Sequence, residues 1–322
     1  MEEKLVKILN EMADYLNISQ MKKLQETLLK HLAENEAKTE EIPNIEYLKM
    51  FIDAKQIEGC SERTLQYYRV TIEHMLGSIE TPIRKITTDE IRGHLVDYQK
   101  VNNCSKVTVD NVRRNMSSFF SWLEEEDYIL KSPMRRIHKI KTKQPVKETI
   151  TDEMIEKLRD NCTCVRDLAM IDLLYSTGIR VGELVGLNIS DIDFEERECI
   201  VFGKGDKERR VYFDAKAKLH LREYIESRTD DNPALFVTLD APHARLKISG
   251  VEIRVRELGR KLNIDKIHPH KFRRTMATRA IDKGMPIEQV QKILGHSQID
   301  TTMQYAIVNQ NNVKVSHRRY IA

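Results

Sequence analysis

The chain has 322 residues, of which 40% are hydrophobic and 32% charged, and its formal net charge is +3. Because a single hydrophobic core stops growing at about 250 to 300 residues, this length predicts two domains plus an extension. No apolar run approaches the roughly 20 residues of a membrane span, and the first residues lack the basic and apolar regions of a signal peptide. We therefore expect a soluble cytoplasmic protein without a membrane partner.

Five cysteines are scattered along the chain, an odd number that favours reduced thiols over a disulfide framework. Cys162 and Cys164 are separated by one residue and have no second ligand pair nearby, so their spacing disfavours a zinc site. We expect the cysteines to be small buried hydrophobic residues.

Charge is distributed unevenly. The first sixty residues carry eight lysines against twelve acidic residues, whereas residues 131–147 carry seven basic residues and no carboxylate. A segment of one charge sign repels itself unless a polyanion lies beside it. This distribution indicates a nucleic-acid partner more clearly than the net charge does.

The first 43 residues are expected to form an extension. Apolar residues recur at helical spacing over residues 2–33, with a break near Asn17 to Ser19, which predicts two amphipathic helices. An acidic linker follows over residues 34–43. The acidic balance favours a docking or oligomerisation element over an accessory arm that grips DNA.

Residues 44–130 are predicted to form a small bundle of four helices, because four apolar stripes follow one another at helical spacing. Ser61 and Ser105 are predicted to cap the N-termini of two of these helices. Helix N-termini with hydroxyls and cations nearby favour phosphate binding. Ordinary solvated helix faces are the alternative. The candidate DNA contacts in this segment are Arg63, Thr64, Arg69, Lys106, Arg113 and Arg114.

Residues 131–147 contain two prolines and no sustained apolar period, and so predict an extended basic linker between domains. Such a linker suits a two-part clamp around a duplex, where phosphate neutralisation supplies much of the affinity. A merely charged tether is the alternative. The candidate contacts here are Arg135, Arg136, Lys139 and Lys141.

The second domain, residues 148–322, is predicted to be mostly helical with one small antiparallel sheet. After an N-cap at Thr151, a buried helix ends at Gly178, and a short helix over residues 181–187 follows. Alternating residues predict a β-hairpin over 198–213 with its turn near residues 204–207. Residues 234–238 are predicted to add a third strand.

The last sixty residues gather groups that suit acid–base chemistry. His270 and Arg273 are three apart and should project from one helix face. A helix beginning with Pro286 at its first position should end at Gly295, immediately before His296. Asp300 is predicted to cap a helix that carries Tyr305.

Taken singly, each of these residues has an ordinary structural interpretation, such as a capping imidazole or an interface tyrosine. Together they meet one chemical demand. A phosphodiester attacked by an oxygen nucleophile accumulates charge on its nonbridging oxygens, and arginine side chains hold such charge well. A nucleophile, a base and an acid complete the set.

Four stretches in order resemble the motifs of the tyrosine recombinases of the phage-integrase and Xer class. Residues 177–184 match the first arginine box, residues 203–209 the lysine hairpin, residues 270–273 the H-x-x-R box, and residues 294–296 with Tyr305 the closing box. The resemblance covers residues 44–308. It implies a core-binding helical SAM-like domain followed by a catalytic domain.

The resemblance also implies a mechanism in which Tyr305 attacks DNA, forms a 3′-phosphotyrosyl link and releases a 5′-hydroxyl. Arginines and a histidine would hold the phosphate, Lys204 would protonate the leaving oxygen, and His270 would assist proton transfer at the tyrosine. Lys207, in the same hairpin, is the alternative acid. The catalytic residues so implied are Arg180, Lys204, His270, Arg273, His296 and Tyr305, with Glu183 supporting Arg180.

No metal or cofactor is required in this scheme. The implied partners are double-stranded DNA, on which four copies would assemble, and an accessory directionality protein; without DNA we expect a monomer or weak dimer, associated with the nucleoid in the cell. The tail after Tyr305 is expected to dock onto a neighbouring protomer, with a frayed terminus as the alternative. Integration, excision, inversion and dimer resolution stay open. A topoisomerase-like nicking enzyme and a catalytically silent DNA-binding regulator are the alternative functions.

Two departures from the resemblance are visible, Phe272 in place of leucine and Arg274 in place of histidine. Neither changes a residue to which a catalytic role is assigned.

Overall fold

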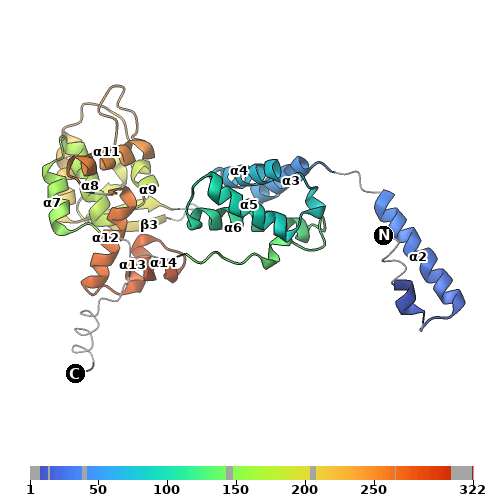
Figure 1. The fold of residues 1–322 in the computed structure, drawn as a ribbon. Coiled ribbons are helices and arrows are strands. Elements are labelled where there is room, and N and C mark those ends of the chain that lie inside the picture. Colours follow the sequence, from blue (N-terminus) through green and yellow to red (C-terminus); the bar gives the residue numbers. More distant parts are fainter. Residues whose placement is uncertain are drawn as a thin grey trace. The chain divides into compact units, whose positions relative to one another are not determined.

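A computed structural model describes residues 8–13, 15–37, 42–142, 148–203, 208–264, 266–305 and 321. The chain divides into two compact units, Met1–Gln144 and Pro145–Ala322 (Figure 1). Among the described residues, no helix combines the length and the apolar character that a membrane span requires.

The N-terminal extension contains a helical turn over residues 8–12 and the helix α2 (Ile18–Ala37). Between them, the side chain of Asn17 accepts a hydrogen bond from the main-chain N–H of Gln20, and the side chain of Gln20 accepts one from that of Asn17, both at 3.0 Å. This reciprocal capping starts a new helix at the predicted break, and α2 continues to Ala37, beyond residue 34 where the linker was predicted to begin.

Four α-helices form the predicted bundle of the first unit: α3 (Asn44–Ile57), α4 (Glu62–Ser78), α5 (Thr88–Val101) and α6 (Lys106–Glu125), with the 3₁₀ turn η1 (Ile83–Lys85) between α4 and α5. Their apolar stripes meet in one core, where the rings of Phe51 and Phe119 pack edge to face with centroids 5.2 Å apart. Ser61 and Ser105 cap α4 and α6 as predicted. The side chain of each serine accepts a hydrogen bond from the main-chain N–H of the residue three positions later.

The basic segment is anchored over its described part, residues 131–142, where an extended linker was predicted. Its first residues form the 3₁₀ helix η2 (Pro133–Arg136), in which Met134 is buried in the core of the bundle. Thr88 donates to the carbonyl of Pro133 at 2.8 Å, and the carboxylate of Asp110 accepts the main-chain N–H of Ile140 at 3.0 Å. Scattered apolar residues that pack on a neighbour produce no sequence period, so this anchoring escaped prediction.

The second unit is built around the buried helix α8 (Val165–Thr177), against which α10 (Ala215–Glu226) and α12 (Pro269–Asp282) pack (Figure 1). Gly178, at φ +63°, ends α8 in the left-handed conformation, as predicted. The remaining helices are α7 (Asp152–Asp160), α9 (Val181–Gly186), the 3₁₀ turn η3 (Ile189–Asp191), α11 (Ile248–Lys261), α13 (Ile287–Leu294) and α14 (Ile299–Met303).

The sheet contains the predicted hairpin of β2 (Glu198–Phe202) and β3 (Glu208–Tyr212), but its third strand is β1 (Ile192–Asp193). All neighbouring strands are antiparallel, in the order β1-β2-β3. The prediction that residues 234–238 form the third strand was wrong. That segment is buried and makes only isolated bridges, from Ala234 to Asn188 and from Val237 to Arg245. Its apolar run reflects burial in the core, which looks like a strand in sequence.

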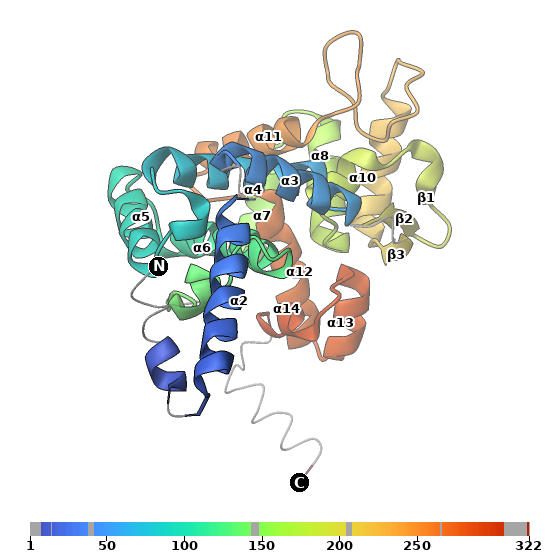
Figure 2. The ribbon, with the colours of Figure 1, turned by 90° about the vertical axis from the view of Figure 1, so that its right-hand side faces the viewer.

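Two details of the C-terminal helices differ from prediction. Pro286 is the N-cap of α13, one position before the predicted first residue of the helix. Asp300 lies in the first turn of α14, whose N-cap is Gln298, and α14 ends before Tyr305. Figure 2 shows α13 and α14 side by side. The nucleophile candidate therefore follows a one-turn helix, and the predicted cap at Asp300 is wrong.

Candidate active site

Arg180 projects from the start of α9 and is held by Glu183. The carboxylate of Glu183 accepts the main-chain N–H of Arg180 at 2.7 Å and its Nη1 at 2.8 Å. Nη2 of Arg180 donates to the carbonyl of Gly295 at 3.2 Å. The side chain of Arg180 remains 40% exposed, so a ligand in solvent can reach it. The expectation that Glu183 braces Arg180 agrees with this geometry.

Arg273 is buried on α12, with 1% of its surface exposed. Its Nη1 donates to the carbonyl of Gly178 at 2.8 Å, and its Nη2 donates to the carbonyl of Leu294 at 2.5 Å and to Nε2 of His296 at 3.0 Å. Burial and the nearby charge of Arg180 lower the pKa of Arg273 to about 10, so the side chain is still a cation at neutral pH.

His296 is neutral near pH 7 because burial, followed by the charges of Arg273 and Arg180, lowers its pKa to about 4. Since Arg273 can only donate, Nε2 of His296 accepts that bond and Nδ1 carries the hydrogen. Nδ1 therefore donates to Oγ1 of Thr302 in α14, at 2.8 Å. The two hydrogen bonds fix both the tautomer and the orientation of the ring.

Tyr305 lies beside His296, with ring centroids 6.0 Å apart. It is 8% exposed and packs in a small apolar cluster with Ala277, Val290 and Leu294. Its main-chain N–H donates to the carbonyl of Thr302 at 2.9 Å. The structure thus brings Tyr305, His296, Arg273 and Arg180 together around the turn at Gly295.

A cleft of about 840 Å³ opens beside this group. Arg180, Gly295 and His296 line it, together with Gly203 and Glu208. The predicted acid Lys204 and its alternative Lys207 lie outside the described residues, as does the tail over residues 306–320. The residues that flank the hairpin tip nevertheless open onto the same cleft as Arg180.

His270 is exposed in the first turn of α12, and its ring stacks on that of His268 with centroids 6.5 Å apart. It adds to the positive surroundings that lower the pKa of His296, after burial and the two arginines. Arg274, the departure noted above, donates through Nη1 to the carbonyl of Glu148 at 2.9 Å.

Arg209 is a member of the site to which the sequence assigned no role. From β3 it donates Nη1 and Nη2 to the two carboxylate oxygens of Glu183, both at 2.7 Å. Its Nε donates to the carbonyl of Ile293 at 2.9 Å. An arginine in a strand gives no sign of which acid it will meet, although Arg209 closes the same hairpin box as Lys204.

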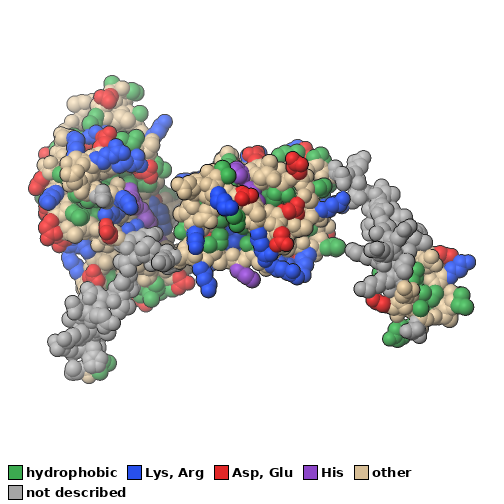
Figure 3. All heavy atoms as spheres, viewed as in Figure 1, with side chains coloured by type: hydrophobic (Ala, Val, Ile, Leu, Met, Phe, Trp, Pro, Cys, Tyr) green, Lys and Arg blue, Asp and Glu red, His purple; other side chains and the backbone are tan. Residues whose placement is uncertain are grey.

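The candidate DNA contacts of the helical unit fall into two groups. Arg113 and Arg135 form ion pairs, with Asp110 at 2.8 Å and with Glu124 at 2.5 Å, and Arg113 is largely buried. Figure 3 shows Lys and Arg side chains interspersed with acidic ones over this unit. The exposed candidates outside these ion pairs are Arg63, Arg69, Lys106, Arg114, Arg136, Lys139 and Lys141, with Thr64 half-buried beside the cap of α4.

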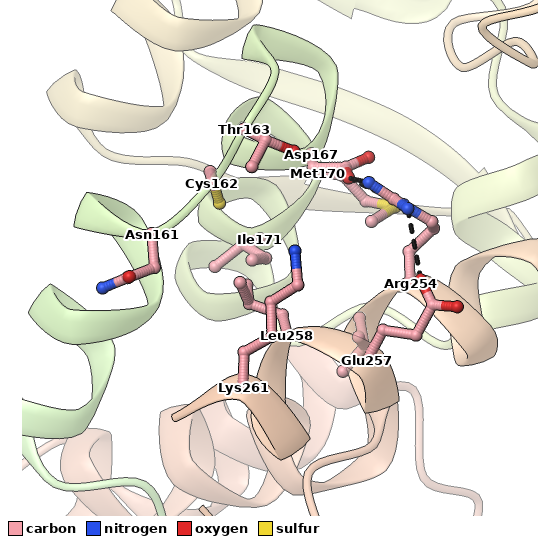
Figure 4. A pocket seen from close by; sticks show the side chains of 11 residues that line it. Asn161, Cys162, Thr163, Asp167, Met170, Ile171, Arg254, Glu257, Leu258 and Lys261 are labelled. Carbon is pink, nitrogen blue, oxygen red and sulfur yellow. Dashed lines mark hydrogen bonds and ion pairs between the residues drawn. The ribbon is translucent and has the colours of Figure 1, made fainter. Parts of the chain in front are cut away.

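Cys162 lines a small pocket in the second unit, near which Arg254 pairs with Asp167 and Glu257 (Figure 4). Burial raises the pKa of the Cys162 thiol to about 12, so the thiol stays protonated at neutral pH. Within the described ranges, no cluster of three or more His, Cys, Asp or Glu residues is arranged to hold a metal ion. Cys162 packs against the core of the unit but is half-buried, where a buried residue was expected.

Two family models match the chain. The model of the phage integrase family matches residues 146–312, and that of the phage integrase N-terminal SAM-like domain matches residues 47–130. Tyrosine recombinase XerC of Oceanobacillus iheyensis is 30% identical over 290 residues, which cover 85% of this chain and 95% of that protein. XerC of Thermodesulfovibrio yellowstonii is 31% identical over 277 residues, or 82% and 92% of the two chains.

Solved structures of two integrases have a similar fold. The Tn1549 transposon integrase in complex with transposon right end DNA has a TM-score of 0.70 at 20% identity, with 86% of this chain and 99% of that chain covered. A lambda integrase dimer bound to a COC′ core site has a TM-score of 0.69 at 18% identity, with 88% and 85% covered. At these identities the likeness concerns the fold alone.

Proposed function

The chain belongs to the phage integrase family of tyrosine recombinases, and from that membership we propose how its own side chains cut and rejoin DNA. The observation that carries the proposal is the convergence of Arg180, Arg273, His296 and Tyr305 on the turn at Gly295. Four residues drawn from separate parts of the chain supply two phosphate-binding cations, a neutral imidazole and a phenol at one place.

In the cleavage step, the phenolic oxygen of Tyr305 attacks the scissile phosphorus. A tyrosine–phosphorus bond forms while the bond to the 5′ oxygen breaks, leaving a 3′-phosphotyrosyl link. The phenolic proton leaves with the help of His270, and Lys204 donates a proton to the departing oxygen, so that a 5′-hydroxyl is released. Because the covalent link conserves the bond energy, a 5′-hydroxyl can reverse the step and rejoin a strand.

Arg180 and Arg273 hold the two nonbridging oxygens on which charge develops. Arg180 is exposed to the cleft and already oriented by Glu183, so little reorganisation is needed when the phosphate arrives. The contacts described for Arg273 use three of its five N–H groups. We assign the other two to a phosphate oxygen, and His296 adds a further hydrogen bond when the phosphate displaces Thr302 from its Nδ1–H, the only N–H of the neutral ring.

Two units of the chain bind DNA in this proposal. The helical domain (residues 44–130), the basic segment (131–147) and the catalytic domain (148–322) contact one duplex, and the extension (1–43) serves docking. Exposed cations on α4, α6 and the basic segment suit phosphate contacts. Four protomers assemble on two sites, and the protein acts on DNA in the cytoplasm. An accessory protein that sets direction is a further partner of this proposal.

Covalent capture tests the reaction. The protein is incubated with a pool of random duplexes that carry nicks, so that cleavage near a nick releases a short strand and traps the adduct. We expect a DNA–protein adduct with wild-type protein, from which the site is sequenced. Adducts that survive in Tyr305→Phe would refute the assignment of the nucleophile. A pool that yields no adduct with wild-type protein would contradict the proposed cleavage mechanism.

A further inference from the structure

Arg209 lines the cleft together with Arg180 and His296, but no catalytic role is assigned to it. Its side chain is only 11% exposed, and all three of its nitrogens donate hydrogen bonds, two to Glu183 and one to Ile293. A buried cation with every nitrogen engaged is fixed in place, because any displacement leaves a carboxylate or carbonyl unpaired.

Glu183 accepts four hydrogen bonds, which is the capacity of a carboxylate. Two come from Arg209, and two come from the main chain and Nη1 of Arg180. Burial opposes the ionisation of Glu183, but the bonds from the two arginines outweigh it and lower its pKa. The carboxylate is therefore shared, and Arg209 determines how much of it Arg180 can occupy.

The second contact of Arg209 reaches the turn that carries His296. Nε donates to the carbonyl of Ile293 in the last turn of α13, and the aliphatic part of the side chain lies against Gly295. A Cβ at Gly295 would come within 2.9 Å of Cδ of Arg209. The glycine thus serves two purposes, because it takes a positive φ of +63° and leaves room for this side chain.

We propose that Arg209 is a positioning residue for DNA cleavage, which holds Arg180 and His296 in register with each other. This inference rests on the proposed function, in which Arg180 and His296 bind the scissile phosphate. Through Glu183 it keeps the guanidinium of Arg180 turned toward the cleft, and through Ile293 it fixes the turn that precedes His296. Without Arg209, the guanidinium of Arg180 pairs with both oxygens of Glu183 and is withdrawn from the phosphate.

Two substitutions and one control separate this role from a general loss of stability. Arg209→Ala removes all the contacts, whereas Arg209→Lys keeps the charge but has one nitrogen in place of three. Arg210→Ala is the matched control, because Arg210 is the next residue of β3, its side chain is 63% exposed and it pairs with Glu198 at 2.7 Å. The site captured by wild-type protein serves as the substrate.

In single-turnover cleavage we expect both Arg209 variants to be slower by about 100-fold, the loss that a 1 Å misplacement of a catalytic group causes. Their affinity for the same duplex should match that of wild-type protein, and Arg210→Ala should cleave at the wild-type rate. A defect confined to DNA affinity, a normal rate in Arg209→Lys, or equal rates for Arg209→Ala and Arg210→Ala would overturn the proposal.

A substrate with sulfur at the 5′ bridging position distinguishes a defect in phosphate binding from a defect in the general acid. A thiolate leaves without protonation, so this substrate restores cleavage only where the general acid is impaired. We expect it to restore the rate of Lys204→Ala and not that of Arg209→Ala. Restoration of Arg209→Ala would show that Arg209 serves the hairpin acid, which contradicts the proposal.

Hydrogen exchange gives a measurement that needs no DNA. In Arg209→Ala we expect faster amide exchange over residues 293–297, and no change in Arg210→Ala. Unchanged exchange in Arg209→Ala would overturn the proposal whatever the cleavage assays show. Absence of any wild-type adduct would instead count against the proposed function, so the two failures are distinguishable.

Discussion

The imidazole of His296 faces the ring of Tyr305, with centroids 6.0 Å apart and ring planes inclined by 29°. Its Nε2 accepts a hydrogen bond from Arg273, and its Nδ1 donates one to Thr302, the fourth residue of α14. One histidine therefore links a buried arginine to the short helix that precedes Tyr305, the proposed nucleophile. Displacement of any of these groups is transmitted to the others through directional bonds.

Tyr305→Phe should abolish covalent capture of DNA while leaving the fold intact. The ring packs in an apolar cluster that phenylalanine also fills, so we expect the free energy of unfolding to change by less than about 1.5 kcal/mol. Denaturant unfolding measures the change in stability, and gel analysis of adducts measures covalent capture. Tyr212→Phe, at an exposed tyrosine of β3, is the control and should retain capture. Adducts from the Tyr305 variant would assign the nucleophile elsewhere.

Gly178→Ala should destabilise the second unit and slow cleavage. Gly178 has φ +63°, where an L-residue costs about 1 to 2 kcal/mol, and an added Cβ would collide with Cε of Met276. The same residue supplies the carbonyl that holds Arg273. Thermal unfolding measures the loss.

Gly186→Ala is the matched control for Gly178→Ala, because no atom lies within 4 Å of an added Cβ there and its φ is ordinary. Equal melting temperatures for the two variants would show that the left-handed turn at Gly178 is not strained by a side chain.

Protonation of His296 should reduce stability as the pH falls. Burial, reinforced by Arg273 and Arg180, lowers its pKa to about 4, whereas an unfolded histidine titrates at about 6.5. Between these values the unfolded chain binds more protons than the folded one, so stability decreases from pH 6.5 down to pH 4 and the loss is complete below pH 4.

The measurement is the free energy of unfolding as a function of pH for wild-type protein and His296→Gln. The wild-type value minus the variant value should decrease as the pH falls through that window. A difference that stays constant would show that the proton on His296 is not linked to folding. Taking the difference removes the contribution of His94, whose pKa burial also lowers to about 4.

Lys139 and Lys141 are exposed and lie in the anchored part of the basic segment, so they should contact phosphates rather than bases. Replacing both with alanine should reduce the slope of log affinity against log salt by about 2, at about 0.9 per phosphate contact. Fluorescence anisotropy at several salt concentrations measures it. We expect no change in melting temperature.

Arg113→Ala is the contrasting variant for that measurement. Arg113 is paired with Asp110, the residue that also holds the main chain of Ile140, and it is largely buried. The Arg113→Ala variant should have a lower free energy of unfolding, and its slope of log affinity against log salt should change little. An unchanged slope in the double lysine variant would refute phosphate contacts by the basic segment.

Local signals predicted most helices because those signals act within a few residues. The capping serines of α4 and α6, the glycine that ends α8 and the apolar stripes of the bundle need no distant partner to be recognised. Predictions failed where a distant partner decides. The segment at 234–238 is buried by the rest of its unit and pairs only through isolated bridges, and residues 131–142 are anchored by α5 and α6.

For the site, the sequence by itself determined which residue types are present and which share a helix, such as His270 and Arg273 on α12. Only the tertiary structure decided that Arg180 and Arg273 meet at the carbonyls around Gly295, that His296 is neutral, and that Glu183 is shared with Arg209. The reason is physical. Hydrogen bonding, burial and pKa depend on distances between groups that lie up to 115 residues apart in the chain, such as the guanidinium of Arg180 and the carbonyl of Gly295, and no local pattern encodes those distances.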